Sequence, residues 1–194
     1  MEQKNTSQFD IPALGICLLF AAGTRLIPHV DNFTPMEAVS LFGAAYFSRK
    51  WWAFLAPVLI MYITDFVINN TVARPFFPQA EGIIWFSNYM IYNTLAYIGI
   101  TILGITFLKK VTASRVVVLS LISSVLFFLI TNFGTWMSEI SMYPRTFSGL
   151  MMSYAAGLPF FRTSVLSTLV FSVMMFGSFS MLKRYIYNTS AFVR

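Results

Sequence analysis

Residues 115–136, RVVVLSLISSVLFFLITNFGTW, form an apolar run that identifies the class of this protein. After Arg115 the run contains no charged residue, and its length matches the about 20 residues that a helix needs to cross the hydrocarbon core of a bilayer. The chain also lacks the regular ten-residue alternation that is typical of membrane β-barrels. We therefore predict an all-α membrane protein.

Five further apolar runs extend this prediction to six transmembrane helices in a single integral membrane domain over residues 1–194. The second run is short for a membrane span, and six helices of about 20 residues would use about 120 residues. Residues 1–10 lack the positive start of a secretory signal, so we expect the first span to be retained. The predicted spans cover residues 11–30, 35–47, 52–69, 83–108, 115–136 and 164–187.

The composition excludes several classes of protein. Hydrophobic residues make up 57% of the chain and charged residues 10%, against roughly 25% charged residues in an ordinary soluble domain. So little polar surface argues against a soluble globular fold, and the apolar content argues against a disordered chain. A single cysteine, Cys17, and a single histidine, His29, exclude internal disulfides, cysteine-ligated clusters and bis-histidine haem. We predict no metal and no cofactor.

The distribution of basic residues predicts the orientation of the helices. Nine of them flank the predicted spans on one side of the membrane, and the positive-inside rule then places both termini in the cytoplasm. The same residues do not form one continuous stripe, so we predict no binding of nucleic acid. These nine residues are Lys4, Arg49, Lys50, Lys109, Lys110, Arg115, Lys183, Arg184 and Arg194.

Three charged residues fall inside predicted spans, where charge is costly and usually faces a partner or a cavity. Arg25, Glu37 and Asp65 all lie toward the outer ends of their spans. This asymmetry predicts a polar cavity that opens outward and has these three side chains as its floor. An alternative is that Arg25 pairs with Glu37 or Asp65 and simply ties helices together; a ligand could also complete such a set.

Further candidates for ligand binding lie in the predicted outer segments and at the end of the fifth span. Asn132 needs a hydrogen-bond partner at membrane depth. Aromatic residues beside Arg145 and Arg162 suit a flat or anionic small molecule, although snorkelling arginines in an interfacial aromatic belt would give the same pattern. A structural role is the alternative for His29. The candidates are His29, Asn32, Asn132, Trp136, Tyr143, Arg145 and Arg162.

Small residues recur at every fourth position in three predicted spans, a spacing that permits close helix packing. The stripes are Ala13, Cys17 and Ala21; Ser40, Ala44 and Ser48; and Ser164, Thr168 and Ser172. Such stripes most often serve packing within a bundle. A stripe that faces lipid would dock a partner subunit.

Several runs of the sequence resemble a family of small bacterial six-span membrane proteins of unknown function. They are RLIPHVDNFTP at 25–35, LFGAAYF at 41–47, TNFGTW at 131–136 and GLPFFR at 157–162. That family in turn looks like the S components of energy-coupling-factor transporters. This resemblance implies an S-component-like bundle in the bacterial cytoplasmic membrane, a ligand pocket near the outer face, and docking on a coupling subunit through Ala13, Cys17 and Ala21.

The sequence contains no catalytic pattern, so we predict that the protein is not an enzyme. The leading hypothesis is a binding or uptake subunit for a small vitamin-like or metabolite-like molecule, working with a separate ATP-driven module. One alternative is a structural or accessory subunit of a larger membrane complex. Another is a membrane enzyme that acts on a lipid or quinone through His29.

Overall fold

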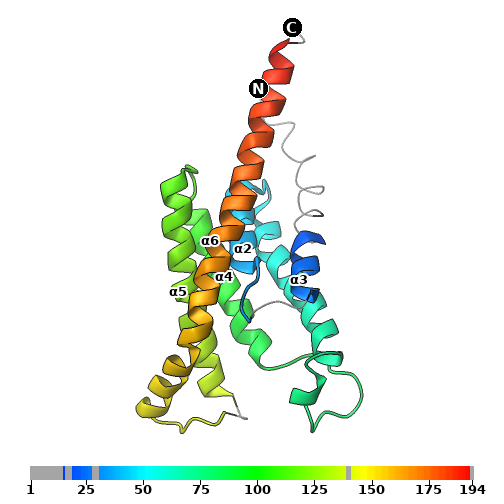
Figure 1. Cartoon of the computed structure of the whole chain (residues 1–194), viewed down its shortest axis with the longest axis vertical. Coiled ribbons are helices and arrows are strands. Elements are labelled where there is room, and N and C mark those ends of the chain that lie inside the picture. The colour runs from blue at the N-terminus through cyan, green and yellow to red at the C-terminus, as the bar shows by residue number, and fades with distance from the viewer. Residues whose placement is uncertain (1–14, 16–18, 28–30, 139–140, 193–194) are drawn as a thin grey trace.

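The computed structural model describes residues 15, 19–27, 31–138 and 141–192, in which the regular elements are all helices and none is a strand. A helical segment at residues 19–26 precedes five longer helices and one short 3-10 helix (Figure 1). These are α2 (Met36–Tyr46), α3 (Lys50–Asn70), η1 (Arg74–Phe76), α4 (Tyr89–Phe107), α5 (Ala113–Met137) and α6 (Phe147–Phe192). The prediction of an all-α chain is confirmed for the described residues.

Four helices are long and apolar enough to cross a membrane, as expected of a membrane protein: α3, α4, α5 and α6 up to Arg184. The bounds of α3 and α5 lie close to the predicted spans 52–69 and 115–136. In contrast, α4 begins at Tyr89 rather than at residue 83. The side chain of Asn70 explains the difference, because it donates to the Ile84 carbonyl and accepts from the Ile84 amide, both at 2.8 Å. These two bonds hold Ile84 in the non-helical connection that precedes α4.

The last helix is longer than predicted. The span expected at 164–187 is the C-terminal part of α6, which begins at Phe147 and includes Pro159. Residues 147–163 were expected to lie in the outer connection before this span. Contacts with α5 instead hold them in the same helix: Ser153 Oγ donates to the Asn132 carbonyl at 2.9 Å. Membrane helices tolerate such residues where neighbouring helices supply the missing contacts.

Helix α2 lies at the centre of the bundle and is too short to cross a membrane alone. Its 11 residues correspond to about 16 Å, against a hydrocarbon core of about 30 Å. It packs against α3, α4, α5 and α6, and its residues from Met36 to Ala44 are all buried. The predicted second span at 35–47 is therefore a buried central helix whose N-terminus lies inside the bundle (Figure 1).

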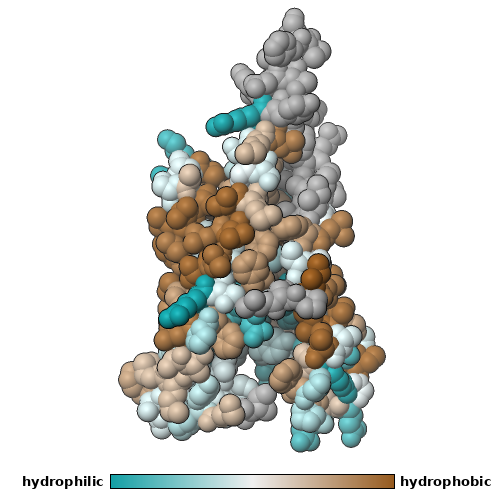
Figure 2. All heavy atoms as spheres, in the orientation of Figure 1, coloured by the Kyte–Doolittle hydropathy of each residue, from teal (hydrophilic) through white to brown (hydrophobic). Residues whose placement is uncertain are grey.

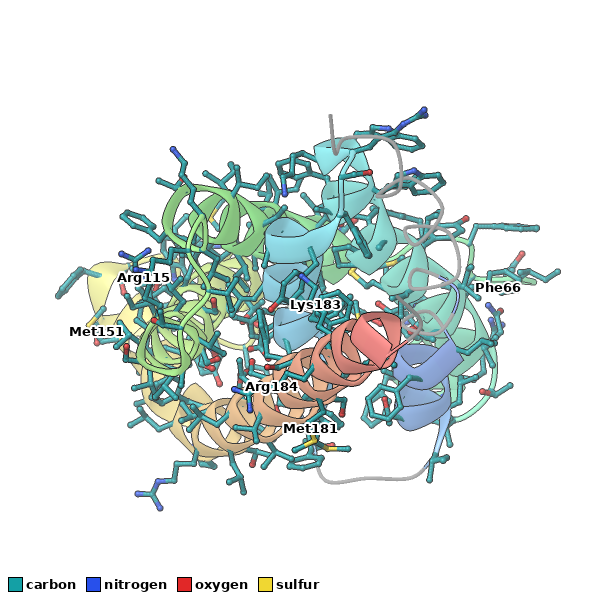
Figure 3. All side chains as sticks on the ribbon, turned by 90° about the horizontal axis from the view of Figure 1, so that it is seen from above. Phe66, Arg115, Met151, Met181, Lys183 and Arg184 are labelled. Atoms are coloured by element: carbon teal, nitrogen blue, oxygen red, sulfur yellow. The ribbon has the colours of Figure 1, made fainter. Side chains whose placement is uncertain are left out.

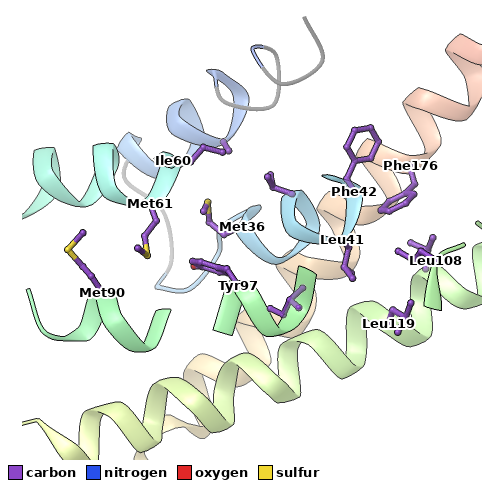
Figure 4. Packing of buried hydrophobic residues seen from close by; sticks show 14 residues of the cluster. Met36, Leu41, Phe42, Ile60, Met61, Met90, Tyr97, Leu108, Leu119 and Phe176 are labelled. Carbon is purple, nitrogen blue, oxygen red and sulfur yellow. The ribbon is translucent and has the colours of Figure 1, made fainter. Parts of the chain in front are cut away.

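The hydrophobic core forms around this central helix (Figure 4). Met36, Leu41 and Phe42 of α2 pack with residues of α3, α4, α5 and α6. The Phe42 ring meets the rings of Phe176 and Phe179 edge to face, each at a centroid distance of 5.4 Å. Edge-to-face contacts of this kind are favourable beyond the area they bury.

The interface between α5 and α6 is polar, whereas the outward face of α5 is apolar. Ser120 Oγ donates to Ser172 Oγ at 2.9 Å, and Ser124 Oγ donates to Thr168 Oγ1 at 3.1 Å. The predicted stripe of Ser164, Thr168 and Ser172 thus serves packing within the bundle. Polar groups inside and apolar groups outside suit a lipid environment. The exposed apolar residues of α5 include Val117, Val118, Leu121, Ile122, Val125 and Leu129.

Basic residues gather at one end of the bundle. The α4–α5 loop and the C-terminal end of α6 lie at the upper end in Figure 1, and the α3–α4 and α5–α6 connections lie at the lower end. Figure 3 looks onto the upper end, where Lys183 and Arg184 of α6 and Arg115 of α5 are labelled. Lys183 Nζ lies 5.1 Å from the centre of the Tyr46 ring, so the C-terminus of α2 is at this end as well.

Close packing of α2 against α4 depends on Gly104. A Cβ added at Gly104 would lie 2.5 Å from the Cβ of Ala44, so the two helices would have to separate. We expect Gly104→Ala to reduce the free energy of unfolding by about 1–3 kcal/mol. The measurement is thermal denaturation of the purified protein in detergent.

Gly177 provides the matched control, because a Cβ there meets nothing within 4 Å. Gly177→Ala is expected to leave stability unchanged or to raise it by up to about 1 kcal/mol through helix propensity. Equal stability of the Gly104→Ala variant and the wild type would contradict the close approach of α2 and α4.

Candidate functional site

A cavity of about 610 Å³ lies beside the N-terminal end of α2. Residues from the helical segment 19–26, the turn at 31–34, α2, α3, α4, α5, the α5–α6 connection and α6 line it. Figure 2 shows the lower end of the molecule divided into two lobes, with hydrophilic side chains visible between them. The volume falls within the range of about 300–1,000 Å³ that is usual for small-molecule sites.

An ion pair between Arg25 and Asp65 forms part of the cavity wall. Arg25 Nη2 contacts Asp65 Oδ1, and the two side chains are 12% and 3% exposed. The pair uses one oxygen only, because Arg25 Nε and Asp65 Oδ2 are buried without a hydrogen-bond partner. Arg25 therefore pairs with Asp65 and not with Glu37. Arg25 and Asp65 also both line the cavity.

Glu37 joins α2 to α6 at the inner end of the cavity. Its side chain is 2% exposed, and its two carboxylate oxygens accept hydrogen bonds of 2.6 Å from Ser164 Oγ and Thr168 Oγ1. Glu37 also lies in the first turn of α2, where the positive end of the helix dipole favours a carboxylate. Ser164 was predicted only as a packing residue. Its spacing of four from Thr168 was the signal for a pair of hydroxyls on one helix face.

Aromatic rings form much of the remaining wall. Tyr97 of α4 and Phe127 of α5 are stacked, with ring centroids 5.5 Å apart and planes inclined by 24°. Phe128 of α5 faces Phe161 of α6 at 5.0 Å. All four residues line the cavity. Phe161 is one of the aromatic residues expected beside Arg162. Tyr97, Phe127 and Phe128 were not predicted, because nothing in an aromatic-rich sequence separates cavity-facing rings from lipid-facing ones.

Two asparagines supply amide groups to the cavity. Asn132 Nδ2 donates to the Phe128 carbonyl at 2.9 Å, so the predicted need for a partner is met within α5. Its side chain packs directly against Gly157 of α6, where no Cβ would fit without displacing it. Asn93 of α4 also lines the cavity and was not predicted.

The predicted residues Asn32 and Tyr143 also line the cavity. Asn32 is exposed and has a positive φ of 59°, and Ser167 Oγ donates to its carbonyl at 3.2 Å. This bond fixes the turn before α2 against α6. The neighbouring Asp31 is exposed and contributes a carboxylate to the same wall.

Three predicted residues do not line the cavity: Trp136, Arg145 and Arg162. Arg145 donates to the carbonyls of Met137 and Ser138 at 2.9 and 2.8 Å, and also contacts the Trp136 carbonyl. Its guanidinium lies 5.8 Å from the centre of the Trp136 ring. Arg145 therefore caps the C-terminus of α5, where carbonyl groups favour a cation. Arg162 is exposed on α6.

The remaining predicted residues concern docking and His29. His29, Ala13 and Cys17 lie outside the described residues. Ala21 is fully buried and packs in the core of the chain itself. Among the residues that the structure describes, no group of three or more His, Cys, Asp or Glu side chains is placed to hold a metal ion.

Comparison with known proteins identifies the family. The model of a family of unknown function, DUF6580, matches residues 4–190, so the chain belongs to that family. No curated protein and no solved structure matches the chain.

Replacing one partner of the Arg25–Asp65 ion pair should lower the stability of the protein more than replacing both partners. Arg25→Met leaves the buried Asp65 carboxylate without its partner, and breaking a buried pair in this way typically costs about 3–5 kcal/mol. The double variant Arg25→Met/Asp65→Leu has no unpaired charge. We therefore expect it to unfold at a higher temperature than the single variant.

Thermal denaturation in detergent of the wild type, both single variants and the double variant tests this expectation. Equal melting temperatures for the wild type and Arg25→Met would show that the pair does not contribute to stability.

Proposed function

We propose that this member of the DUF6580 family is a non-enzymatic membrane subunit that binds a small molecule for uptake. The supporting observation is the cavity itself: it has the size of a ligand site, and it brings Arg25, Glu37 and Asp65 together among helices that are apolar enough to cross a membrane. Charged groups inside membrane proteins usually mark binding sites or pathways, because their burial is costly.

We further propose six membrane-inserted segments with both termini in the cytoplasm of a bacterial cell. The helical segment 19–26 and the short helix α2 would join the four long helices. Seven of the basic residues predicted to be cytoplasmic are described: Arg49, Lys50, Lys109, Lys110, Arg115, Lys183 and Arg184. Their loops and helix ends lie at the end of the bundle opposite the α3–α4 and α5–α6 connections (Figures 1 and 3). The positive-inside rule makes this the cytoplasmic end, so the cavity would open to the outside.

Uptake would require a source of energy outside this chain. The resemblance to S components supports a separate ATP-driven coupling module, with the small-residue stripe of the first helix as its docking face. Ala21, the member of this stripe that the structure describes, packs inside the bundle itself.

An accessory subunit of a larger membrane complex is a second candidate. It is favoured by the aromatic side chains exposed on the α3–α4 connection, where Phe76, Trp85 and Phe86 are 78%, 63% and 54% exposed. Purification in mild detergent separates the two candidates. A stoichiometric partner unrelated to ATP-driven uptake would favour the accessory role.

Ligand binding is tested on the purified protein with a panel of vitamins and metabolites, using thermal shift and native mass spectrometry. A ligand at 100 times its Kd should stabilise the protein by about 2.7 kcal/mol. Gly157→Leu should remove this effect, because the new side chain displaces Asn132 and narrows the cavity.

Gly177→Leu is the matched control on the same helix, because a Cβ at Gly177 meets nothing within 4 Å. It should retain the full stabilisation by ligand. If no compound of the panel stabilises the wild type, or if Gly157→Leu responds like the wild type, the cavity is not the proposed binding site.

A further inference from the structure

We propose that the molecule bound in this cavity is a small organic cation, a protonated amine or quaternary ammonium attached to an apolar or aromatic group. This inference rests on the proposed function and specifies the chemical class of its ligand. Three features of the cavity carry it: the balance of charge, the aromatic walls and the free acceptor on Asp65.

The charged side chains that line the cavity are unequal in number. Among the described residues they are one guanidinium, from Arg25, and three carboxylates, from Asp31, Glu37 and Asp65. The ion pair neutralises Arg25 with Asp65. Glu37 is held by two neutral hydroxyls, so its charge has no cationic partner among these residues. The described wall therefore holds three carboxyl groups and one guanidinium.

The N-terminus of α2 offsets only part of this excess. A helix N-terminus is equivalent to about half of a positive charge, and hydroxyl donors contribute dipoles rather than charge. In surroundings of low dielectric constant the remaining field is screened less than it would be in water. A cation that enters the cavity is attracted, and an anion is repelled.

The aromatic walls favour the same class of ligand. Tyr97, Phe127, Phe128 and Phe161 present rings to the cavity from three helices. The faces of aromatic rings attract ammonium groups through their quadrupoles and also bury the apolar part of such a molecule. Cages of aromatic rings are a common means of binding quaternary ammonium groups.

The hydrogen-bonding groups agree with this assignment. Asp65 Oδ2 is an acceptor without a partner, and each oxygen of Glu37 retains a lone pair beyond its hydroxyl bond. Arg25 Nη2 is engaged with Asp65, while Arg25 Nε is a buried donor without a partner. Arg145 is engaged with the carbonyls at the end of α5. An anionic ligand would therefore share the one guanidinium that lines the described cavity with the carboxylate of Asp65.

Three probes that share one bicyclic ring test the charge preference: quinolin-3-ylmethanamine, quinoline-3-carboxamide and quinoline-3-carboxylate. Their dissociation constants are measured at pH 7 by equilibrium dialysis against the full chain in detergent. We expect the amine to bind at least about tenfold more tightly than the carboxamide, and the carboxylate to bind most weakly.

Glu37→Gln tests whether the carboxylate is responsible, because glutamine keeps the size of the side chain and can still hydrogen-bond Ser164 and Thr168. The amine should lose about tenfold in affinity and the carboxamide should be unaffected. Asp31→Asn, at an exposed position of the wall, provides a second variant should Glu37→Gln fail to fold. Glu81→Gln is the control, because Glu81 is exposed and does not line the cavity.

Tighter binding of the carboxamide or the carboxylate would overturn the assignment of a cation while leaving a binding cavity in place. An equal loss of affinity for all three probes in Glu37→Gln would also overturn it, because Glu37 would then act only on the shape of the site. If none of the probes binds, the cation assignment fails, and the metabolite panel decides separately whether the cavity binds any ligand.

Discussion

The length of α2 is the constraint on which the rest of the structure depends. An 11-residue helix at the centre of the bundle reaches only about half of the way through a bilayer core, whereas the helices around it are long enough to cross. Its C-terminus lies at the basic end of the bundle, where Tyr46 meets Lys183. Its N-terminus therefore ends inside the bundle, and the space beyond Thr34 and Glu37 is the cavity. A longer second helix would fill this space.

The polar groups around the cavity also hold the bundle together. Glu37 ties α2 to α6, the ion pair ties the segment 19–26 to α3, and serine and threonine hydroxyls tie α5 to α6. Association of helices in lipid gains little from burial of apolar surface, because lipid tails are as apolar as leucine side chains. Hydrogen bonds and close contacts at small residues such as Gly104 must supply the stability instead. A binding site built from these same groups links occupancy of the cavity to the packing of the helices.

The sequence predicted the general architecture well and the details of the site in part. Apolar runs predicted α3 and α5 closely, and charges inside apolar runs predicted Arg25, Glu37 and Asp65 as cavity residues, because the cost of burying charge depends little on the precise fold. The predicted start of the last helix was wrong, because α6 begins at Phe147 and not at residue 164. Whether Gly157 and Pro159 interrupt a helix depends on contacts with α5, which the local sequence does not reveal. Arg145 and Trp136 were placed in the candidate site because arginine and aromatic side chains together suit a flat or anionic ligand. In the structure they bind one another and the end of α5 instead.

The rings of Tyr97 and Phe127 could not be predicted, because an aromatic residue in a membrane helix has the same local pattern whether it faces lipid or a cavity.

Access of water to the cavity from the side opposite the basic residues is the central claim. It is tested most directly by cysteine accessibility in a Cys17→Ser background, with a membrane-impermeant cationic methanethiosulfonate applied to vesicles of known orientation. Asn93 lines the cavity, whereas Leu95 on the same helix is 49% exposed on the outer surface of the bundle. We predict that Asn93→Cys reacts in right-side-out vesicles and not in inverted ones, and that Leu95→Cys, shielded by lipid, reacts in neither. Reaction of Asn93→Cys only in inverted vesicles, or no reaction in either orientation, would contradict an outward-facing aqueous cavity.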